Sequence, residues 1–130
     1  MTDDAFPIVL VVDDDRTQVA LLTSFLKKAG FRVVSALSGV DALEALKNVG
    51  GNARKAISLL VSDLDMPGMD GRAFALEMRR QNPSLKVLYV TASADRLFQS
   101  GRLLEAHEAF LEKPVTQDLL REAVNLLLIR

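Results

Sequence analysis

Two short apolar runs of this chain each lead into a group of aspartates. The aspartates that follow residues 8–12 and residues 57–62 are Asp13, Asp14, Asp15, Asp63 and Asp65. Each run has the length and composition of a buried strand, so each acidic group is predicted to stand at the carboxyl end of a strand. Carboxylates repel one another, and several gathered together therefore indicate a cation site or an anionic reaction centre.

Two further predicted strands end in other reactive groups. Residues 86–90 lead into Thr91, and residues 109–112 lead into Lys113. A set of carboxylates, a hydroxyl and a lysine suits phosphoryl transfer, because Mg²⁺ takes carboxylate and phosphate oxygens while lysine neutralises charge. Asp63 can act as the attacking group, since aspartate forms acyl phosphates in covalent catalysis.

The elements that must position these groups alternate along the chain. Strands are predicted at 8–13, 31–36, 57–62, 86–91 and 109–112, and amphipathic segments lie between and after them. The residues expected to cap helices at their N-termini are Asp15, in a capping box with Gln18, and Ser38, Asp70 and Thr116. A less regular helix is predicted over 95–108, and an exposed loop over 48–55.

Five repeated βα units predict a doubly wound α/β domain, a parallel sheet with helices on both faces. Ligands bind such sheets outside the carboxyl ends of the strands, where the strand order reverses. For the order 2-1-3-4-5 this point lies between the first and third strands, which are the two that end in aspartates.

The composition narrows the possible functions. The 130 residues fit one domain, and 49% are hydrophobic. The net charge of −1 gives no electrostatic case for binding nucleic acid or an anionic membrane. The chain has no cysteine and one histidine, His107, which excludes disulfides, thiolate chemistry and histidine metal clusters. It has no membrane-spanning stretch and no basic signal at its N-terminus, and a cytoplasmic protein is expected.

At its strand ends the sequence closely resembles the receiver domains of two-component response regulators. The matching segments are Asp13-Asp14, the run from Asp63 through Met66-Pro67-Gly68-Met69-Asp70-Gly71, Val90-Thr91-Ala92, and Lys113-Pro114. The resemblance extends from about Ile8 to Leu128. It implies a flavodoxin-like fold and a single receiver domain over 1–130, with no output domain in this chain.

The resemblance also implies roles for the acidic cluster. Asp63 is expected to accept a phosphoryl group from a phosphohistidine of a sensor histidine kinase or a phosphotransfer protein. Mg²⁺ is the implied cofactor, bound by the side chains of Asp14 and Asp63, by Asp13 through water and by the backbone carbonyl of Asp65. Lys113 would hold a carboxylate before phosphorylation and the phosphoryl group afterwards.

A conformational switch is implied beside this cluster. Thr91 would bond the phosphoryl oxygen, and Phe110 would turn inward as Thr91 moves, altering the 94–128 face for a downstream protein, an output domain or a phosphorylation-dependent dimer. Phe110 stands where many family members have tyrosine, so the ring packs without a phenol hydroxyl. Asp65 and Ser93 occupy the positions that help to set the rate of phosphoryl hydrolysis in the family.

Three other interpretations are open from the residues. The chain could be a receiver cut from a hybrid histidine kinase. Asp63-Leu64-Asp65 is also similar to the nucleophile motif of haloacid dehalogenase phosphohydrolases, although that motif normally ends the first strand of a longer chain. A non-phosphorylatable interaction module is disfavoured, because every residue that the chemistry needs is present. The expected protein is thus a signalling switch and not an enzyme acting on a diffusible substrate.

Overall fold

A computed structural model describes residues 7–49, 56–64, 66, 70–92 and 107–128. Within these residues the strands and helices follow one another as the sequence predicts, with three bounds shifted by one residue. The first strand ends one residue earlier than expected, the second begins one residue later, and the fifth begins one residue earlier. The strands are β1 (Ile8–Val12), β2 (Arg32–Ala36), β3 (Ile57–Ser62), β4 (Lys86–Thr91) and β5 (Glu108–Glu112). The helices are α1 (Arg16–Lys28), α2 (Gly39–Val49), α4 (Gly71–Arg79) and α6 (Gln117–Leu128). The loop expected over 48–55 is wrong for residues 48 and 49, which belong to α2, and its remaining residues lie outside the described ones. The helix expected over 95–108 also lies outside them except for its last two residues, a turn at His107 and the start of β5 at Glu108.

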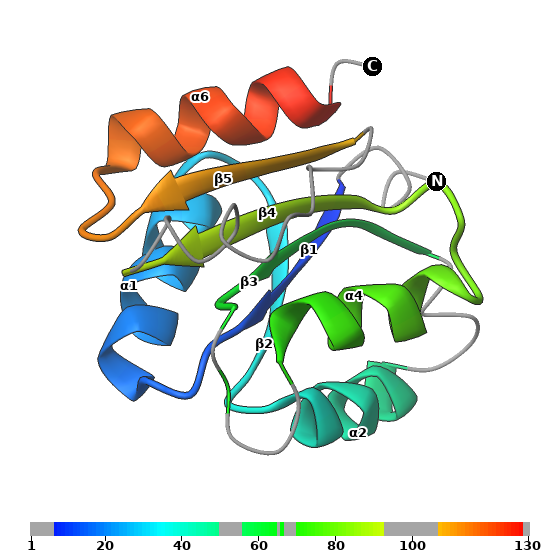
Figure 1. Ribbon diagram of the computed structural model, residues 1–130. Coiled ribbons are helices and arrows are strands. Elements are labelled where there is room, and N and C mark those ends of the chain that lie inside the picture. Colours follow the sequence, from blue (N-terminus) through cyan, green and yellow to red (C-terminus); the bar gives the residue numbers. More distant parts are fainter. Residues whose placement is uncertain (1–6, 50–55, 65, 67–69, 93–106, 129–130) are drawn as a thin grey trace, which may run out of the picture.

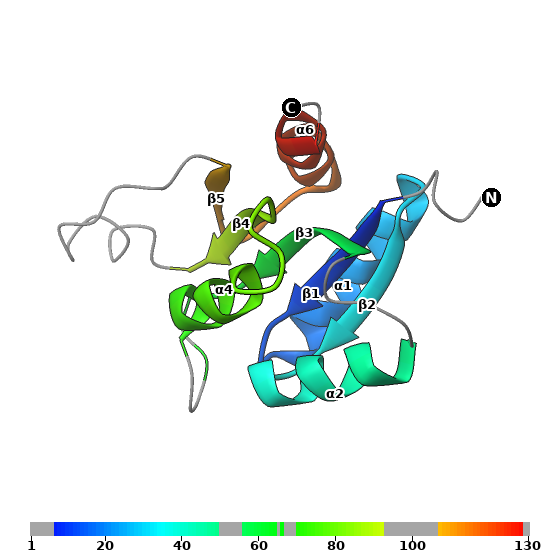
Figure 2. The same ribbon diagram turned by 90° about the vertical axis from the view of Figure 1, so that its right-hand side faces the viewer.

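The five strands form one parallel sheet of order β2-β1-β3-β4-β5 (Figure 1). This order confirms the predicted doubly wound topology, and it places β1 and β3 side by side. Helices α2 and α4 lie on one side of the sheet, and α1 and α6 lie on the other (Figure 2). Among the described residues, no helix combines the length and apolar character needed to cross a membrane.

The central strands are buried on both faces because their side chains alternate between two cores. Leu10, Leu60 and Tyr89 pack with α2 and α4. Their chain neighbours on the same strands face α1 and α6, as Val11, Val61 and Val90 do. The continuous apolar runs therefore hold the strands rigidly, and the polar residues that follow them emerge together at one rim of the sheet.

Side-chain caps fix where the helices start, as the sequence predicts. The Asp15 carboxylate accepts from the backbone N–H groups of Thr17 and Gln18 at 2.9 and 3.3 Å. The capping box does not close as expected, because the Asp15 N–H donates to the Asp13 carboxylate at 3.0 Å instead. This difference connects the start of α1 to the acidic cluster.

Three more helix starts carry the caps expected for them. Ser38 accepts from the N–H of Asp41, Asp70 from that of Ala73, and Thr116 from that of Leu119, at 3.0, 2.7 and 3.2 Å.

Candidate functional site: an acidic cluster at the carboxyl ends of β1 and β3

The first and third strands bring their terminal aspartates together. The N–H of Asp63 donates to the carbonyl of Val12 at 3.1 Å, which continues the pairing of β3 with β1 past the last strand residue. Asp13, Asp14 and Asp63 each offer a carboxylate oxygen, and these oxygens lie within 4.8 Å of one another. Asp13 and Asp63 are buried, with 1% and 8% of their surface exposed, whereas Asp14 is exposed to solvent.

Lys113, which follows the edge strand β5, contacts the two buried aspartates. Its Nζ lies 2.9 Å from Oδ2 of Asp13 and 3.4 Å from Oδ2 of Asp63. The backbone N–H of Lys113 donates to the carbonyl of Thr91 at 2.8 Å, so the ends of β4 and β5 stay paired where the lysine leaves the sheet. The described residues thus place two carboxylates, those of Asp13 and Asp63, against one ammonium group, with the Asp14 carboxylate beside them.

Burial and the opposite charge nearby shift the pKa values of Asp13 and Lys113 in opposite directions. Burial raises the pKa of Asp13, and the hydrogen bond from Asp15 and the contact with Lys113 offset only part of that rise. Burial alone lowers the pKa of Lys113, but Asp13 and Asp63 outweigh this effect and raise it. Lys113 is therefore a stable cation, while Asp13 carries its negative charge at a cost that a bound cation would relieve.

The two residues predicted to act as a switch lie on the neighbouring strands. Thr91 ends β4 and is 1% exposed. Phe110 on β5 is half-buried, pairs in register with Tyr89 and packs against the core under α4. Asp65 and Ser93, the other residues predicted around the site, lie outside the described residues.

The structure adds Gly71 to this site, a residue that the sequence indicated only as part of a helix start. Gly71 begins α4, and its N–H donates to the carbonyl of Leu64 at 2.8 Å. A Cβ atom at this position would overlap the backbone carbonyl oxygen of Asp63 and lie 3.1 Å from the Cα of Leu64. The absence of a side chain here therefore lets the backbone of Asp63 take its place. In the sequence, Gly71 was the last residue of the run that resembles the receiver family and part of a predicted helix start, and neither observation indicated its contact with Asp63.

Comparison with known proteins agrees with this geometry. The family described as response regulator receiver domain matches residues 9–125. Sensor kinase CckA of Brucella abortus is 32% identical over 118 residues, which cover 91% of this chain. The chain spans 12% of the length of that kinase, and also 12% of the sensor histidine kinase RcsC of Salmonella typhimurium.

Solved structures are similar over nearly the whole chain. A response regulator receiver domain protein from Clostridium thermocellum has a TM-score of 0.79 at 25% identity, over 96% of both chains. The response regulator TrrA of Thermotoga maritima, solved in complex with Mg²⁺ and BeF, has a TM-score of 0.73 at 27% identity and covers 94% of this chain and 99% of its own. Sequence, fold and site together lead to one assignment: the chain belongs to the response regulator receiver domain family.

Proposed function

We propose that this chain is the phosphoacceptor switch of a two-component phosphorelay, with Asp63 as the residue that is phosphorylated. The observation that carries this proposal is the position of Asp63, which lies within reach of Asp13, Asp14 and Lys113 at the end of β3. A carboxylate in this position can attack a phosphorus atom while the neighbouring groups hold the transferred oxygens.

The transfer makes one bond and breaks one. A carboxylate oxygen of Asp63 forms a P–O bond as the P–N bond of a phosphohistidine breaks, and the histidine nitrogen keeps the electron pair. Lys113 holds Asp63 before the reaction, with Nζ 3.4 Å from Oδ2. Because its pKa is raised, Lys113 stays charged and can then pair with a phosphoryl oxygen. The receiver acts on itself in this scheme and is not an enzyme with a diffusible substrate.

The cluster fits Mg²⁺ as the cofactor of this step. Three hard carboxylate oxygens within 4.8 Å of one another are the ligand type that Mg²⁺ prefers, and one lysine leaves their negative charge only partly balanced. Asp14 and Asp63 would hold the ion through their side chains, Asp13 through water and Asp65 through its backbone carbonyl. The bound ion would neutralise charge on the phosphoryl oxygens.

The output of the switch is proposed to pass through Thr91 and Phe110 to the 94–128 face. Of that face, the structure describes β5 and α6. The partners would be a sensor histidine kinase or phosphotransfer protein upstream, and a downstream protein, an output domain or a second phosphorylated copy at this face. The relatives include sensor kinases and a response regulator, so the variant in which the chain is the receiver of a hybrid histidine kinase is equally compatible with them.

Phosphorylation by a small donor tests the proposal directly. We expect acetyl phosphate and Mg²⁺ to add one phosphoryl group, measured by intact-mass spectrometry, and EDTA or Asp63→Asn to abolish the addition. Asp70→Asn is the matched control, because Asp70 caps α4 from an exposed position and asparagine caps equally well. Phosphorylation of Asp63→Asn at the normal rate, or steady hydrolysis of a phosphomonoester, would contradict the proposal, and the second result would favour the hydrolase.

A further inference from the structure

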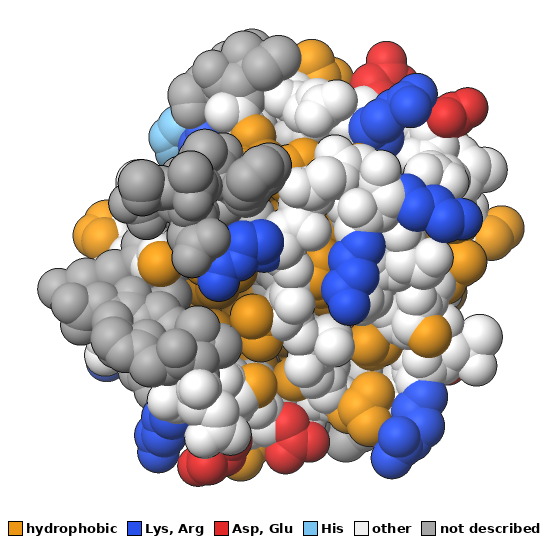
Figure 3. Space-filling view, turned by 180° about the vertical axis from the view of Figure 1, so that it is seen from behind, with side chains coloured by type: hydrophobic (Ala, Val, Ile, Leu, Met, Phe, Trp, Pro, Cys, Tyr) orange, Lys and Arg blue, Asp and Glu red, His pale blue; other side chains and the backbone are white. Residues whose placement is uncertain are grey.

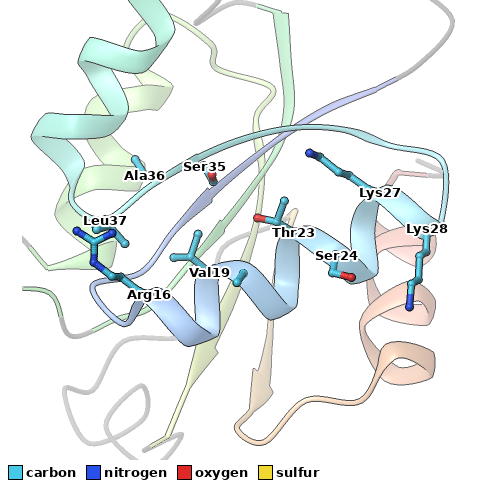
Figure 4. A pocket seen from close by; sticks show the side chains of 10 residues that line it. Arg16, Val19, Thr23, Ser24, Lys27, Lys28, Ser35, Ala36 and Leu37 are labelled. Atoms are coloured by element: carbon cyan, nitrogen blue, oxygen red, sulfur yellow. The ribbon is translucent and has the colours of Figure 1, made fainter.

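A groove of about 700 Å³ runs between helix α1 and edge strand β2, and none of the three clustered aspartates lines it (Figure 4). Val19 of α1 gives it a buried apolar surface, and the residues Thr23, Ser24 and Ser35 that line it carry hydroxyl groups. The lining residues are Arg16, Val19, Ala20, Thr23, Ser24, Lys27, Lys28, Ser35, Ala36 and Leu37.

The rim of this groove is basic at both ends. Figure 4 shows Arg16 and Lys27 extending from α1 toward β2, at opposite ends of the groove. They stand eleven residues apart on the helix, which corresponds to about 16 Å. Within the described part of the chain, neither of them forms an ion pair. Seen from behind, basic side chains spread over the molecule from top to bottom, while the acidic ones lie toward its top and bottom edges (Figure 3).

The far wall of the groove is the open edge of the sheet. The N–H of Arg32 and the carbonyl of Ala36 both bond toward β1, through Pro7 and Asp13. Alternate residues of a strand direct their backbone groups to opposite sides, so those of Val33 and Ser35 point outward. No strand pairs with this side of β2 among the described residues. An open edge of this kind can accept an added strand.

One hydroxyl in the groove also lacks a partner. The Oγ1 atom of Thr23 is buried and accepts or donates no hydrogen bond within the described residues. Buried polar atoms normally have a partner. The hydroxyl is closed off from solvent, so the hydrogen-bonding groups that the groove presents to a peptide are the backbone groups on the open edge of β2.

We propose that this groove binds an extended acidic segment of a partner protein, which adds to β2 as a further strand. Every second side chain of this segment would face α1. The first and third of these would be carboxylates, four residues or about 13 Å apart along the strand, and the one between them would be apolar. The carboxylates would pair with Arg16 and Lys27, and the apolar side chain would cover Val19. The open strand edge favours a peptide over a nucleic acid, because its N–H and carbonyl groups complement a peptide backbone.

Charge argues against a second copy of this chain as the occupant. Two β2 strands that pair antiparallel about their centres would bring Arg16 of each molecule toward Lys27 of the other, on the same face of the joined sheet. Like charges placed opposite one another oppose association. A partner segment that carries carboxylates at these two points removes the repulsion and provides the complementary charge.

A designed peptide tests the groove without knowledge of the natural partner. The probe has seven residues, with glutamate at the second and sixth positions, valine at the fourth and threonine at the others. In ¹⁵N-¹H NMR titrations we expect saturable shifts at Val33, Ser35 and Thr23. The same peptide with lysine in place of glutamate should produce no such shifts, nor should a version whose β2-facing backbone nitrogens are methylated.

Charge reversal supplies the matched pair of variants. Lys27→Glu should weaken binding of the glutamate peptide roughly tenfold, whereas Lys47→Glu, an equal charge change at an exposed position on α2, should leave it within about twofold. Equal weakening by both variants, absence of shifts at the three amides, or tighter binding of a short single-stranded oligonucleotide would overturn the proposal. Asp63→Asn should bind the peptide normally, so this test is independent of phosphorylation.

Discussion

Gly71 lets α4 begin directly against the backbone of Asp63, and its replacement is expected to disturb the site from outside the acidic cluster. The added methyl of Gly71→Ala would overlap the Asp63 carbonyl oxygen, so the 63–64 backbone must move. We expect a loss of about 1–3 kcal/mol in the free energy of unfolding, as for other overpacked positions. Phosphorylation by acetyl phosphate should also be slower, measured by intact-mass time courses.

A control variant, Gly30→Ala, separates the loss of stability expected for Gly71→Ala from the slower phosphorylation. Gly30 has φ of 98° after α1, and nothing lies within 4 Å of a Cβ built there. Alanine at this position should cost stability through backbone strain alone, with an unchanged phosphorylation rate. Normal phosphorylation of Gly71→Ala would show that Gly71 does not position Asp63.

The carboxyl group of Asp13 is expected to lower stability as it ionises in metal-free buffer. Because burial raises the pKa of Asp13 above its ordinary value of 3.8, the folded state holds this proton more tightly than the unfolded chain. The free energy of unfolding therefore falls as pH rises from near 3.8 through the raised pKa of Asp13. At pH values above that pKa, the whole of this loss is present. Relative to the parent protein, Asp13→Asn should therefore gain stability between about pH 3 and pH 7 in EDTA.

Urea unfolding at each pH measures this trend. Asp118→Asn is a suitable control, because the Asp118 side chain is 86% exposed and its pairing with Arg121 is on the surface. The free energy of unfolding of Asp118→Asn should stay within about 0.5 kcal/mol of that of the parent protein, because exposed ion pairs contribute little. If the difference in unfolding free energy between Asp13→Asn and the parent protein does not change with pH, burial does not have the effect on Asp13 that we assign to it.

Strand β5 is held to the sheet by a polar network at its start, on the opposite rim from the acidic cluster. Glu108 accepts from Nη1 of Arg79 at 2.8 Å and from the hydroxyl of Tyr89 at 3.2 Å. Burial and the charge of Glu108 raise the pKa of Tyr89, so the phenol remains a donor. The network connects α4, β4 and β5, three elements whose positions bear on Phe110.

Glu108→Ala should destabilise the protein by about 2–3 kcal/mol. The substitution removes the carboxylate that accepts hydrogen bonds from both the buried Tyr89 and the largely buried Arg79. Glu77→Ala is the matched control. Its carboxylate pairs with Arg80 at 3.6 Å, with both side chains at least 44% exposed, and its loss should change stability by less than about 0.5 kcal/mol. Equal effects in chemical denaturation would show that the network is not stabilising.

The elements themselves were largely predictable, and the reason is local. Continuous apolar runs marked the strands, and the caps at Asp15, Ser38, Asp70 and Thr116 are short-range interactions that the sequence spells out. The capping box predicted at Asp15 was wrong for one of its two hydrogen bonds. The Asp15 N–H donates to Asp13, which belongs to the acidic cluster, and not to the side chain of Gln18. The Glu108 network joins residues 29 positions apart, and no local pattern indicates it.

The stability of the whole domain should respond to Mg²⁺ through the acidic cluster. A ligand that binds only the folded state stabilises it by about 2.7 kcal/mol at a hundred times its Kd, and so raises Tm. Asp14→Ala should abolish this rise, measured by thermal unfolding with Mg²⁺ and with EDTA. Without metal the variant should melt at the same temperature as the parent protein or higher, because like charges have been removed. A variant unfolded at room temperature would mean that Asp14 is structural.

The parallel α/β fold, the family and the strand ends that carry Asp13, Asp14, Asp63, Thr91 and Lys113 could all be predicted from residue patterns. These predictions need only local patterning and the rule that the carboxyl ends of parallel strands share one rim. Three features were visible only once the chain was folded: the contacts of Lys113 with Asp13 and Asp63, the close approach of Gly71 to the Asp63 backbone, and the basic groove between α1 and β2. Such contacts depend on how separate elements pack, and the packing is set by the two cores as a whole.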